Sequence, residues 1–183
     1  MTFWVTLLVV VVLVSVFGVV LYNRLVQARN RVDNAWGQVD VQLKRRYDLV
    51  PNLVETVKGY ASHEQETLEA VVKARAAAQA ATDPAAQAEA ENVLTGALRQ
   101  LFALAESYPE LRAAPNFADL QTQLSDTENR IAVSRQIYND SVLTYNNAVQ
   151  TVPTNLVAGL GGFDVRPFFE AGERVDEPPA VEF

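Results

Sequence analysis

The chain has 183 residues, one His, no Cys, a hydrophobic fraction of 49% and a net charge of −7. Without Cys there is no disulfide framework, thiolate metal site or Cys nucleophile. Residues 24–60 carry seven bases and four acids, a net of +3, whereas the chain beyond them carries eight bases and eighteen acids, a net of −10. This acidic body argues against nucleic-acid binding, which needs a basic surface to neutralise phosphates.

The segment Phe3–Tyr22 is apolar, and no charged side chain precedes Arg24. A helix of this length spans about 30 Å, the thickness of the hydrocarbon core of a bilayer. Trp4 and Tyr22 stand near its two ends, where amphipathic rings favour the membrane interface. A cleaved signal peptide is the alternative, but it would need a basic start and a small-residue cleavage site. The sequence therefore predicts a retained transmembrane helix, with residues 1–23 as the anchor.

Basic residues predict how this helix is oriented. Arg24, Arg29 and Arg31 follow the apolar segment, with Asp33 as the nearest acid. Because Lys and Arg near the ends of a transmembrane helix are retained on the cytoplasmic side, we expect the main domain in the cytoplasm and the N-terminus outside.

Helical periodicity continues beyond the anchor. Apolar residues recur at steps of three and four from Val32 to Val57, which predicts a helix over about residues 24–59 that begins within the membrane. Pro51 interrupts the hydrogen-bond ladder of this helix, so a kink is predicted there. The alternative is a new helix that starts with Asp48 as its N-cap and Pro51 in its first turn.

Capping residues mark where the next helices start. Gly59 is expected to end the first helix in a left-handed conformation. Ser62 and Gln65 have the spacing of a capping box, and Asp83 followed by Pro84 predicts an N-cap and a first helical residue. Three further helices are predicted over residues 63–81, 84–107 and 116–151.

Four helices with short connections predict an all-α fold, in which the transmembrane helix continues into an antiparallel up-and-down four-helix bundle over residues 24–152. Residues 153–183 are rich in Gly, Pro and Phe, and an irregular tail without helix is expected, frayed over its last eight or so residues. Phe163, Phe168 and Phe169 are costly to leave in water, so we expect part of the tail to pack on the bundle or on a partner.

The sequence offers no reaction centre. His63-Glu64 begins like the zinc-protease motif H-E-x-x-H, but residue 67 is Thr, so the second ligand is missing. A glycine-rich phosphate loop is missing too, because Gly159, Gly161 and Gly162 lack the required spacing. We therefore expect a non-enzymatic protein with no catalytic residue, cofactor or metal site.

The basic residues Arg24, Lys44, Arg45 and Arg46 are candidate interaction residues, as are Phe163, Phe168 and Phe169. The cluster Lys44-Arg45-Arg46 has two interpretations: contact with anionic lipid or an acidic partner, or a solvated helix face. We favour a solvated face, or contact with the acidic face of a neighbouring copy.

Tyr-Asn pairs recur at Tyr22-Asn23, Tyr138-Asn139 and Tyr145-Asn146. Two of them are seven residues apart on one predicted helix, so they lie on the same face. We interpret them as core Tyr residues beside a polar flank.

Long stretches of the sequence resemble the LemA family. They are YNRLVQARNRVDNAWGQVDVQLKRRYDLVPNLVETVKGYASHE at 22–64, ESYPELRA at 106–113, NFADLQTQLSDTENRIAVSRQIYND at 116–140, VLTYNNAVQTVPTNLVAG at 142–159 and GFDVRPFFE at 162–170. The resemblance implies a bacterial single-pass protein of the inner membrane with an antiparallel helical bundle and an external N-terminus. It brings no catalytic residues, and it implies an association with envelope stress and membrane organisation.

Two functions are therefore expected. The first is a membrane-anchored scaffold or adaptor that assembles with copies of itself, its partners being the lipid bilayer and itself. Head-to-tail contact between the basic and acidic parts of neighbouring copies would build rings or filaments. The second is a regulatory partner of another membrane protein, such as a protease, which would dock on the tail at Gly161–Phe169.

Overall fold

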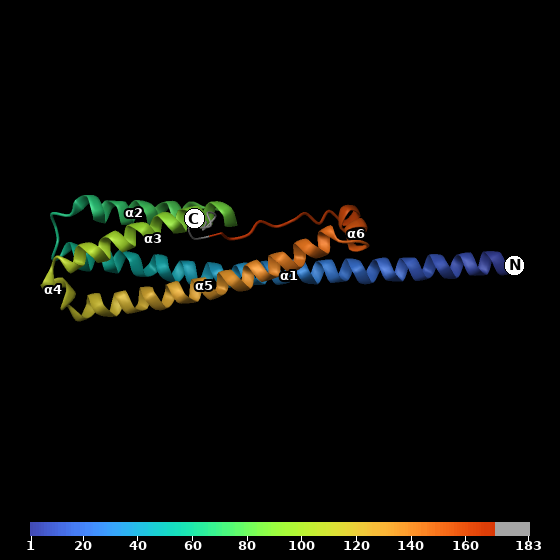
Figure 1. Ribbon diagram of the computed structural model, residues 1–183, viewed down its shortest axis with the longest axis horizontal. Helices are drawn as coiled ribbons and strands as arrows, with labels where there is room; N and C mark the ends of the chain where they lie inside the picture. The colour runs from blue at the N-terminus through green and yellow to red at the C-terminus, as the bar shows by residue number, and fades with distance from the viewer. Residues whose placement is uncertain (171–183) are drawn as a thin grey trace, which may run out of the picture. The chain divides into compact units, whose positions relative to one another are not determined.

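The structure, a computed structural model, describes residues 1–170 of the chain. Every regular element in this part is an α-helix (Figure 1), which confirms the predicted all-α fold. The helices are α1 (Thr2–Lys58), α2 (Gln65–Ala80), α3 (Pro84–Glu106), α4 (Pro109–Arg112), α5 (Pro115–Gln150) and α6 (Thr154–Gly161). The fraying expected for the last residues lies outside the described part.

Helix α1 is continuous from the apolar segment through Pro51 to Lys58. The helix predicted over residues 24–59 therefore does begin within the apolar segment. The alternative of a new helix at Pro51 is wrong, because the residues before the proline keep their helical conformation.

The chain divides into two compact units, and α1 and α5 each contribute residues to both. Unit 1 comprises Met1–Lys44 and Glu128–Phe168, which include α6. Among the described residues, unit 2 comprises Arg45–Thr127 with Phe169 and Glu170, and it includes α2, α3 and α4.

The core of unit 1 forms where an apolar stripe of α1 meets a tyrosine-bearing face of α5. The stripe recurs at helical spacing, as expected for one buried face of an amphipathic helix. Trp36 is half-buried, and its ring centroid lies 5.2 Å from that of Tyr138. The buried side chains include Leu21, Leu25, Val32, Ala35, Val39 and Leu43 from α1 and Ile131, Tyr138, Val142 and Tyr145 from α5.

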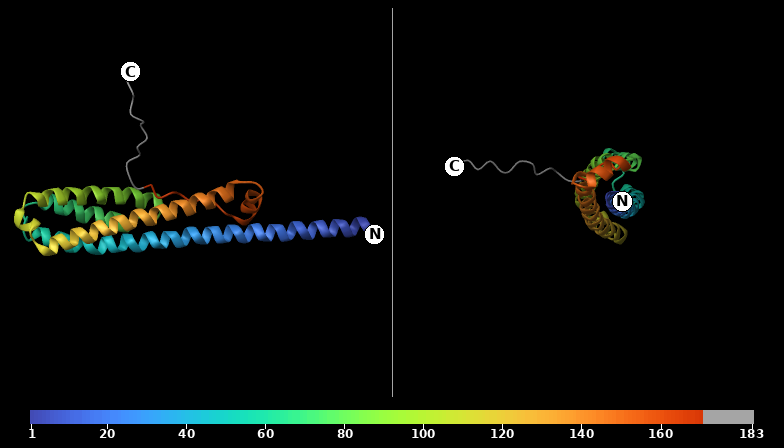
Figure 2. Two further views of the ribbon diagram at one scale, coloured as in Figure 1. Left: turned by 60° about the horizontal axis from the view of Figure 1, so that its bottom comes forward. Right: turned by 90° about the vertical axis from the view of Figure 1, so that its right-hand side faces the viewer.

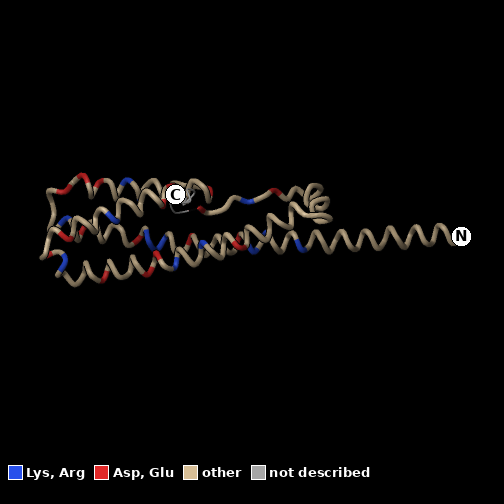
Figure 3. Tube along the Cα trace, in the orientation of Figure 1, with Lys and Arg blue, Asp and Glu red and all other residues tan. Residues whose placement is uncertain are grey.

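The N-terminal part of α1 stays outside this core. Its most apolar window of 18 residues has a mean hydropathy of 2.9, and only 6% of that window is buried. Figure 3 shows this stretch without a charged residue. Among the described helices, α1 is the one long and apolar enough to cross a membrane.

Unit 2 is built around α2 and α3, which lie side by side (Figure 2). Leu94, Leu98 and Leu101 of α3 are buried, and the Phe102 ring lies edge-on to Phe117, with centroids 6.1 Å apart. The N-cap of α3 is as predicted, because Asp83 Oδ1 accepts hydrogen bonds from the N–H groups of the second and third residues after it, at 3.0 Å each. These bonds satisfy donors that the start of a helix leaves free.

Two predictions about helix ends are wrong. Gly59 is not left-handed, since the one described residue with positive φ is Gly162. Instead, Gly59 N–H still donates to Glu55 C=O at 3.3 Å, and the helix ends in a tighter turn in which Tyr60 N–H donates to Val57 C=O at 3.0 Å. The capping box of Ser62 and Gln65 is also absent, because α2 starts one residue after its N-cap Glu64, and no side chain caps it.

The described part of the chain has two helices beyond the four that were predicted. Residues 109–112 form the one-turn helix α4, which buries Leu111. Beyond Pro153, where no helix was expected, α6 covers Thr154–Gly161. It ends because Gly162 adopts the left-handed conformation that glycine tolerates without steric cost, with φ 65°.

Candidate functional site

A network of polar side chains is buried in unit 2, where α1 meets α3. Arg46 and Glu91 are 4% and 3% exposed, and Arg46 Nη1 donates to Glu91 Oε2 at 2.9 Å. Arg46 Nη2 also donates to Thr95 Oγ1 at 2.8 Å. A buried charge is costly unless it is paired and hydrogen-bonded, and this arrangement satisfies both conditions.

Tyr47 completes the network. Its hydroxyl donates a short hydrogen bond to the other oxygen of Glu91, Oε1, and accepts one from Gln87 Nε2 at 2.7 Å. Gln87 Nε2 also donates to the Ala78 carbonyl of α2, at 2.9 Å. Burial raises the pKa of the Tyr47 hydroxyl well above its usual value, and the hydrogen bond to the Glu91 carboxylate raises it further. The network thus joins α1, α2 and α3 within unit 2.

Pro51 creates a second link between α1 and α2. A proline has no N–H, so the carbonyl four residues before it, on Tyr47, lacks its normal helical donor. Arg75 of α2 supplies the missing bond, because its Nε donates to that carbonyl at 2.7 Å. The Arg75 side chain therefore replaces the backbone donor that Pro51 removes from α1.

In unit 1, side chains of α5 hold the backbone of the C-terminal segment, residues 163–168. Tyr145 Oη donates to the Asp164 carbonyl, and Tyr138 Oη donates to the Pro167 carbonyl, both at 2.9 Å. Asn146 binds both polar groups of the Arg166 backbone: its Nδ2 donates to the carbonyl at 2.9 Å, and its Oδ1 accepts from the N–H at 2.8 Å.

Side chains of the C-terminal segment contact α1. The Phe163 ring is 5.4 Å from that of Tyr22 in an edge-on arrangement, and the Arg29 guanidinium lies 5.1 Å from its centroid. Arg166 Nη2 lies 3.3 Å from Asp33 Oδ1, but both side chains are about half exposed, so this ion pair contributes little. The segment is therefore held mainly by its backbone and by Phe163.

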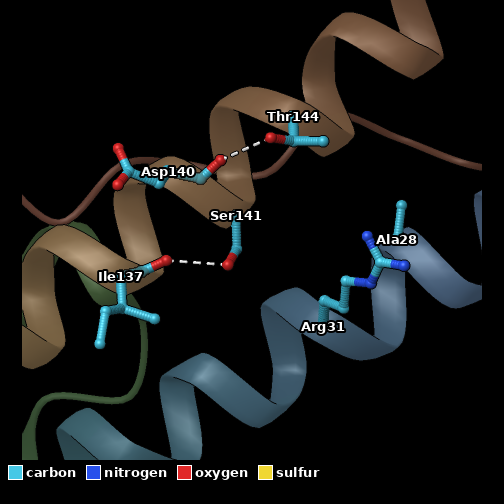
Figure 4. Close-up of a pocket in the computed structure, with 6 residues that line it drawn as sticks. All are labelled: Ala28, Arg31, Ile137, Asp140, Ser141 and Thr144. Atoms are coloured by element: carbon cyan, nitrogen blue, oxygen red, sulfur yellow. Dashed lines mark hydrogen bonds between the residues drawn. The ribbon is translucent and has the colours of Figure 1, made fainter.

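An open groove of about 270 Å³ lies between α1 and α5 in unit 1 (Figure 4). Its two hydroxyl groups are turned back to their own helix: Ser141 Oγ donates to Ile137 C=O at 2.8 Å, and Thr144 Oγ1 donates to Asp140 C=O at 2.9 Å. Within residues 1–170, no three His, Asp or Glu side chains are grouped to hold a metal ion.

The predicted basic residues have different environments. Arg24, Lys44 and Arg45 are exposed, whereas Arg46 is buried against Glu91. The solvated face expected for the cluster therefore excludes Arg46, because α1 turns this residue onto its buried side. A clue was available in the spacing of Gln87, Glu91, Leu94 and Leu98, which places two polar residues on the apolar face of α3.

The predicted aromatic residues are mostly buried. Phe163 is 5% exposed and Phe169 is fully buried, whereas Phe168 is 37% exposed. Two of the three Phe side chains are thus packed on their own chain, which is one of the two expected outcomes. The recurring Tyr-Asn pairs were the signal for this contact, since Tyr138, Tyr145 and Asn146 hold the segment.

A model of the LemA family matches residues 35–183. The chain belongs to the LemA family. This confirms the resemblance found in the sequence motifs.

The chain is similar to two groups of relatives. The LemA protein of Metamycoplasma hominis is 28% identical over 160 residues, which cover 84% of this chain and 72% of the relative. The magnetosome protein MamQ of Magnetospirillum gryphiswaldense is 35% identical over 82 residues, and MamQ 1 of Paramagnetospirillum magneticum is 33% identical over a stretch of the same length. These two matches cover 45% of this LemA-family chain but 30% of the magnetosome proteins.

Proposed function

We propose that this LemA-family chain is a non-enzymatic, membrane-anchored scaffold or adaptor that self-associates in the inner membrane of a bacterium. The observation that carries the proposal is the exposed apolar part of α1, which is 6% buried in its most apolar window and continues without a break into the part of α1 that forms the core of unit 1. So large an apolar surface is unfavourable in water, and its length matches the hydrocarbon core of a bilayer.

The continuous helix would give the anchor a mechanical role. Leu21, near the end of the apolar segment, and Leu25, just after it, are both buried in the core of unit 1, so the membrane-spanning part and the core share one rigid element. The proposed architecture is an antiparallel up-and-down bundle of the four longer helices, α1, α2, α3 and α5. A protein built in this way would hold its bundle at a fixed angle to the membrane, which suits a scaffold of the bacterial envelope or of its stress response.

The proposed orientation places the bundle in the cytoplasm and the N-terminus outside. Arg24, Arg29 and Arg31 directly follow the apolar segment, and such residues are retained on the cytoplasmic side. Because the chain has no Cys, single-Cys variants give a clean test. A Cys in place of the exposed Val133 should resist an impermeant thiol reagent in intact cells and react after lysis. Labelling in intact cells would show that the bundle lies outside the cytoplasm and would contradict the proposed orientation.

Self-association is proposed from the separation of charge, with a net of +3 over residues 24–60 and −10 beyond them. Contacts between unlike surfaces of neighbouring copies close into rings or extend into filaments. Particle size in mild detergent tests this proposal. We expect assemblies that shrink as salt rises, because salt screens contacts between exposed charges. A monomer at physiological salt would contradict self-association.

A second candidate function, regulation of a membrane enzyme such as a protease, is favoured by one observation. Phe168 is 37% exposed although its neighbour Phe169 is fully buried, so one aromatic side chain of the segment is accessible to a partner. A photo-crosslinking residue at position 168 should then capture that enzyme, whereas one at the exposed Val133 should not. Equal capture from both positions would reject the segment as the docking site.

A further inference from the structure

Helix α6 presents an apolar face to its surroundings. Leu156 and Leu160 are one helical turn apart on α6 and are 66% and 92% exposed, whereas Ala158 is buried. Val152, just before the helix, is 78% exposed. An amphipathic helix on a water-soluble protein has the opposite arrangement, with large apolar side chains inward and polar side chains outward.

The region around α6 is also free of charge. No Asp, Glu, Lys or Arg lies between Asp140 and Asp164. Figure 3 shows the same absence along the last turns of α5 and through α6. Solvated helices usually carry charged residues on their outer face, so this composition does not suit an environment of bulk water.

The C-terminal end of α6 lies beside the end of the apolar segment of α1, and both belong to unit 1. A Cβ atom built on Gly161 would lie 3.3 Å from Tyr22 Cε2. Phe163, immediately after α6, also packs edge-on to Tyr22. Figures 1 and 2 likewise show α6 next to α1. Since Tyr22 ends the segment proposed to cross the bilayer, α6 is at the level where the chain leaves the hydrocarbon core.

We propose that α6 is a second membrane contact, which lies in the interface of the bilayer that α1 crosses, with Leu156 and Leu160 among the lipids. This inference rests on the proposed membrane anchoring by α1. The lipid bilayer is the occupant that the geometry favours, because this charge-free helix ends beside Tyr22, where the apolar segment of α1 also ends. An interfacial helix buries its apolar face about 5–10 Å deep in the bilayer, so leucine side chains on one face of the helix would lie among the lipid chains.

The second contact would restrain the protein about the axis of α1. A single spanning helix leaves the body free to rotate around it, whereas a second contact beside Tyr22 selects one face toward the membrane. The C-terminal segment holds α6 in place, because Phe163 packs on Tyr22 and under Arg29. Gly161 permits this approach, since a Cβ there would come within 2.6 Å of the Phe163 ring.

Spin labels on single-Cys variants of the full-length protein, reconstituted in vesicles of phosphatidylethanolamine and phosphatidylglycerol, test the proposal. Labels at Leu160→Cys and Leu156→Cys should collide several-fold less with a water-soluble nickel complex, and more with oxygen, than a label at Val133→Cys. Val133 is a matched control because it is 59% exposed on α5 in the same unit. A label at Val12→Cys reports separately on the anchor.

The four labels distinguish the two proposals. If Val12 is shielded from nickel but Leu156 and Leu160 are as accessible as Val133, α6 lies in water and the inference is wrong, while the anchor stands. If Val12 is accessible to nickel, the proposed anchoring fails, and the inference fails with it. Shielding of Leu160 that disappears when the protein is diluted in lipid would mean that a second copy covers α6, which also overturns the proposal.

Discussion

At the scale of single residues, the buried ion pair of Arg46 and Glu91 has the largest predicted effect on stability. Replacing Glu91 by Gln removes the carboxylate that balances a guanidinium only 4% exposed. Breaking a buried pair in this way costs about 3–5 kcal/mol, because a charge stays in a low-dielectric environment without its counter-charge.

The free energy of unfolding, measured by denaturant titration of the helical signal, should fall by about that amount in Glu91→Gln. Glu89→Gln is the control, since Glu89 is an exposed residue of the same helix. Equal effects of the two substitutions would show that the buried pair has no special role.

The raised pKa of the Tyr47 hydroxyl predicts that the protein loses stability at alkaline pH. Burial and the Glu91 hydrogen bond raise the pKa of this hydroxyl in the folded state. The unfolded chain ionises near the ordinary tyrosine pKa of about 10, so it releases a proton that the folded protein retains. The stability from this group is therefore complete below about pH 10 and is lost as the pH rises above it.

Denaturant titrations between about pH 8 and 11 should show this decline, and it should be shallower in Tyr47→Phe. Some decline will persist, since burial also raises the pKa values of Tyr138 and Tyr145. Identical slopes for the variant and the unmodified protein would contradict the assignment to Tyr47.

At the scale of elements, the link between α1 and α2 depends on Pro51. Arg75→Ala should cost about 1–3 kcal/mol, because it leaves the Tyr47 carbonyl without a donor. In the background Pro51→Ala the same change should cost about 1 kcal/mol less, because residue 51 then donates the missing helical bond. The double-mutant cycle of unfolding free energies measures this coupling. Additive effects would mean that Arg75 stabilises the fold in some other way.

The C-terminal segment is a second element-scale feature that can be tested. The Arg166 N–H donates to Asn146 Oδ1 at 2.8 Å, so its hydrogen exchange should be slow. Asn146→Ala should speed exchange over residues 163–167, whereas Asn147→Ala, at the neighbouring exposed residue, should not. Mass-spectrometric deuterium uptake gives the comparison. Unchanged uptake in Asn146→Ala would show that the segment is held without this side chain.

The helices were largely predictable because their signals are local. Periodicity from Val32 to Val57 and the Asp83-Pro84 start of α3 depend on residues close in sequence. The Arg46–Glu91 pair was not predictable, because its two residues are 45 apart in the sequence. Charged residues are also normally expected on the surface of a protein. Helix α6 was missed because the glycines in this stretch suggested an irregular tail. The burial of Ala158 and the left-handed conformation of Gly162 at its end stabilise a helix there.

At the scale of the whole molecule, α1 is one continuous element with two proposed roles. Its apolar part is proposed to cross the membrane, and the residues after Tyr22 enter the core of unit 1 without a break. The anchor would therefore set the angle at which neighbouring copies meet, in addition to retaining the protein at the membrane.

A flexible Gly-Ser insertion after Asn23 tests this central claim most directly, with the same insertion after the exposed Thr82, between α2 and α3, as the control. Both variants should stay in the membrane fraction. The particle size of the full-length protein in lipid nanodiscs should fall for the insertion after Asn23 and stay unchanged for the control. Assemblies of normal size with the insertion after Asn23 would contradict the account and leave the anchor as a simple tether.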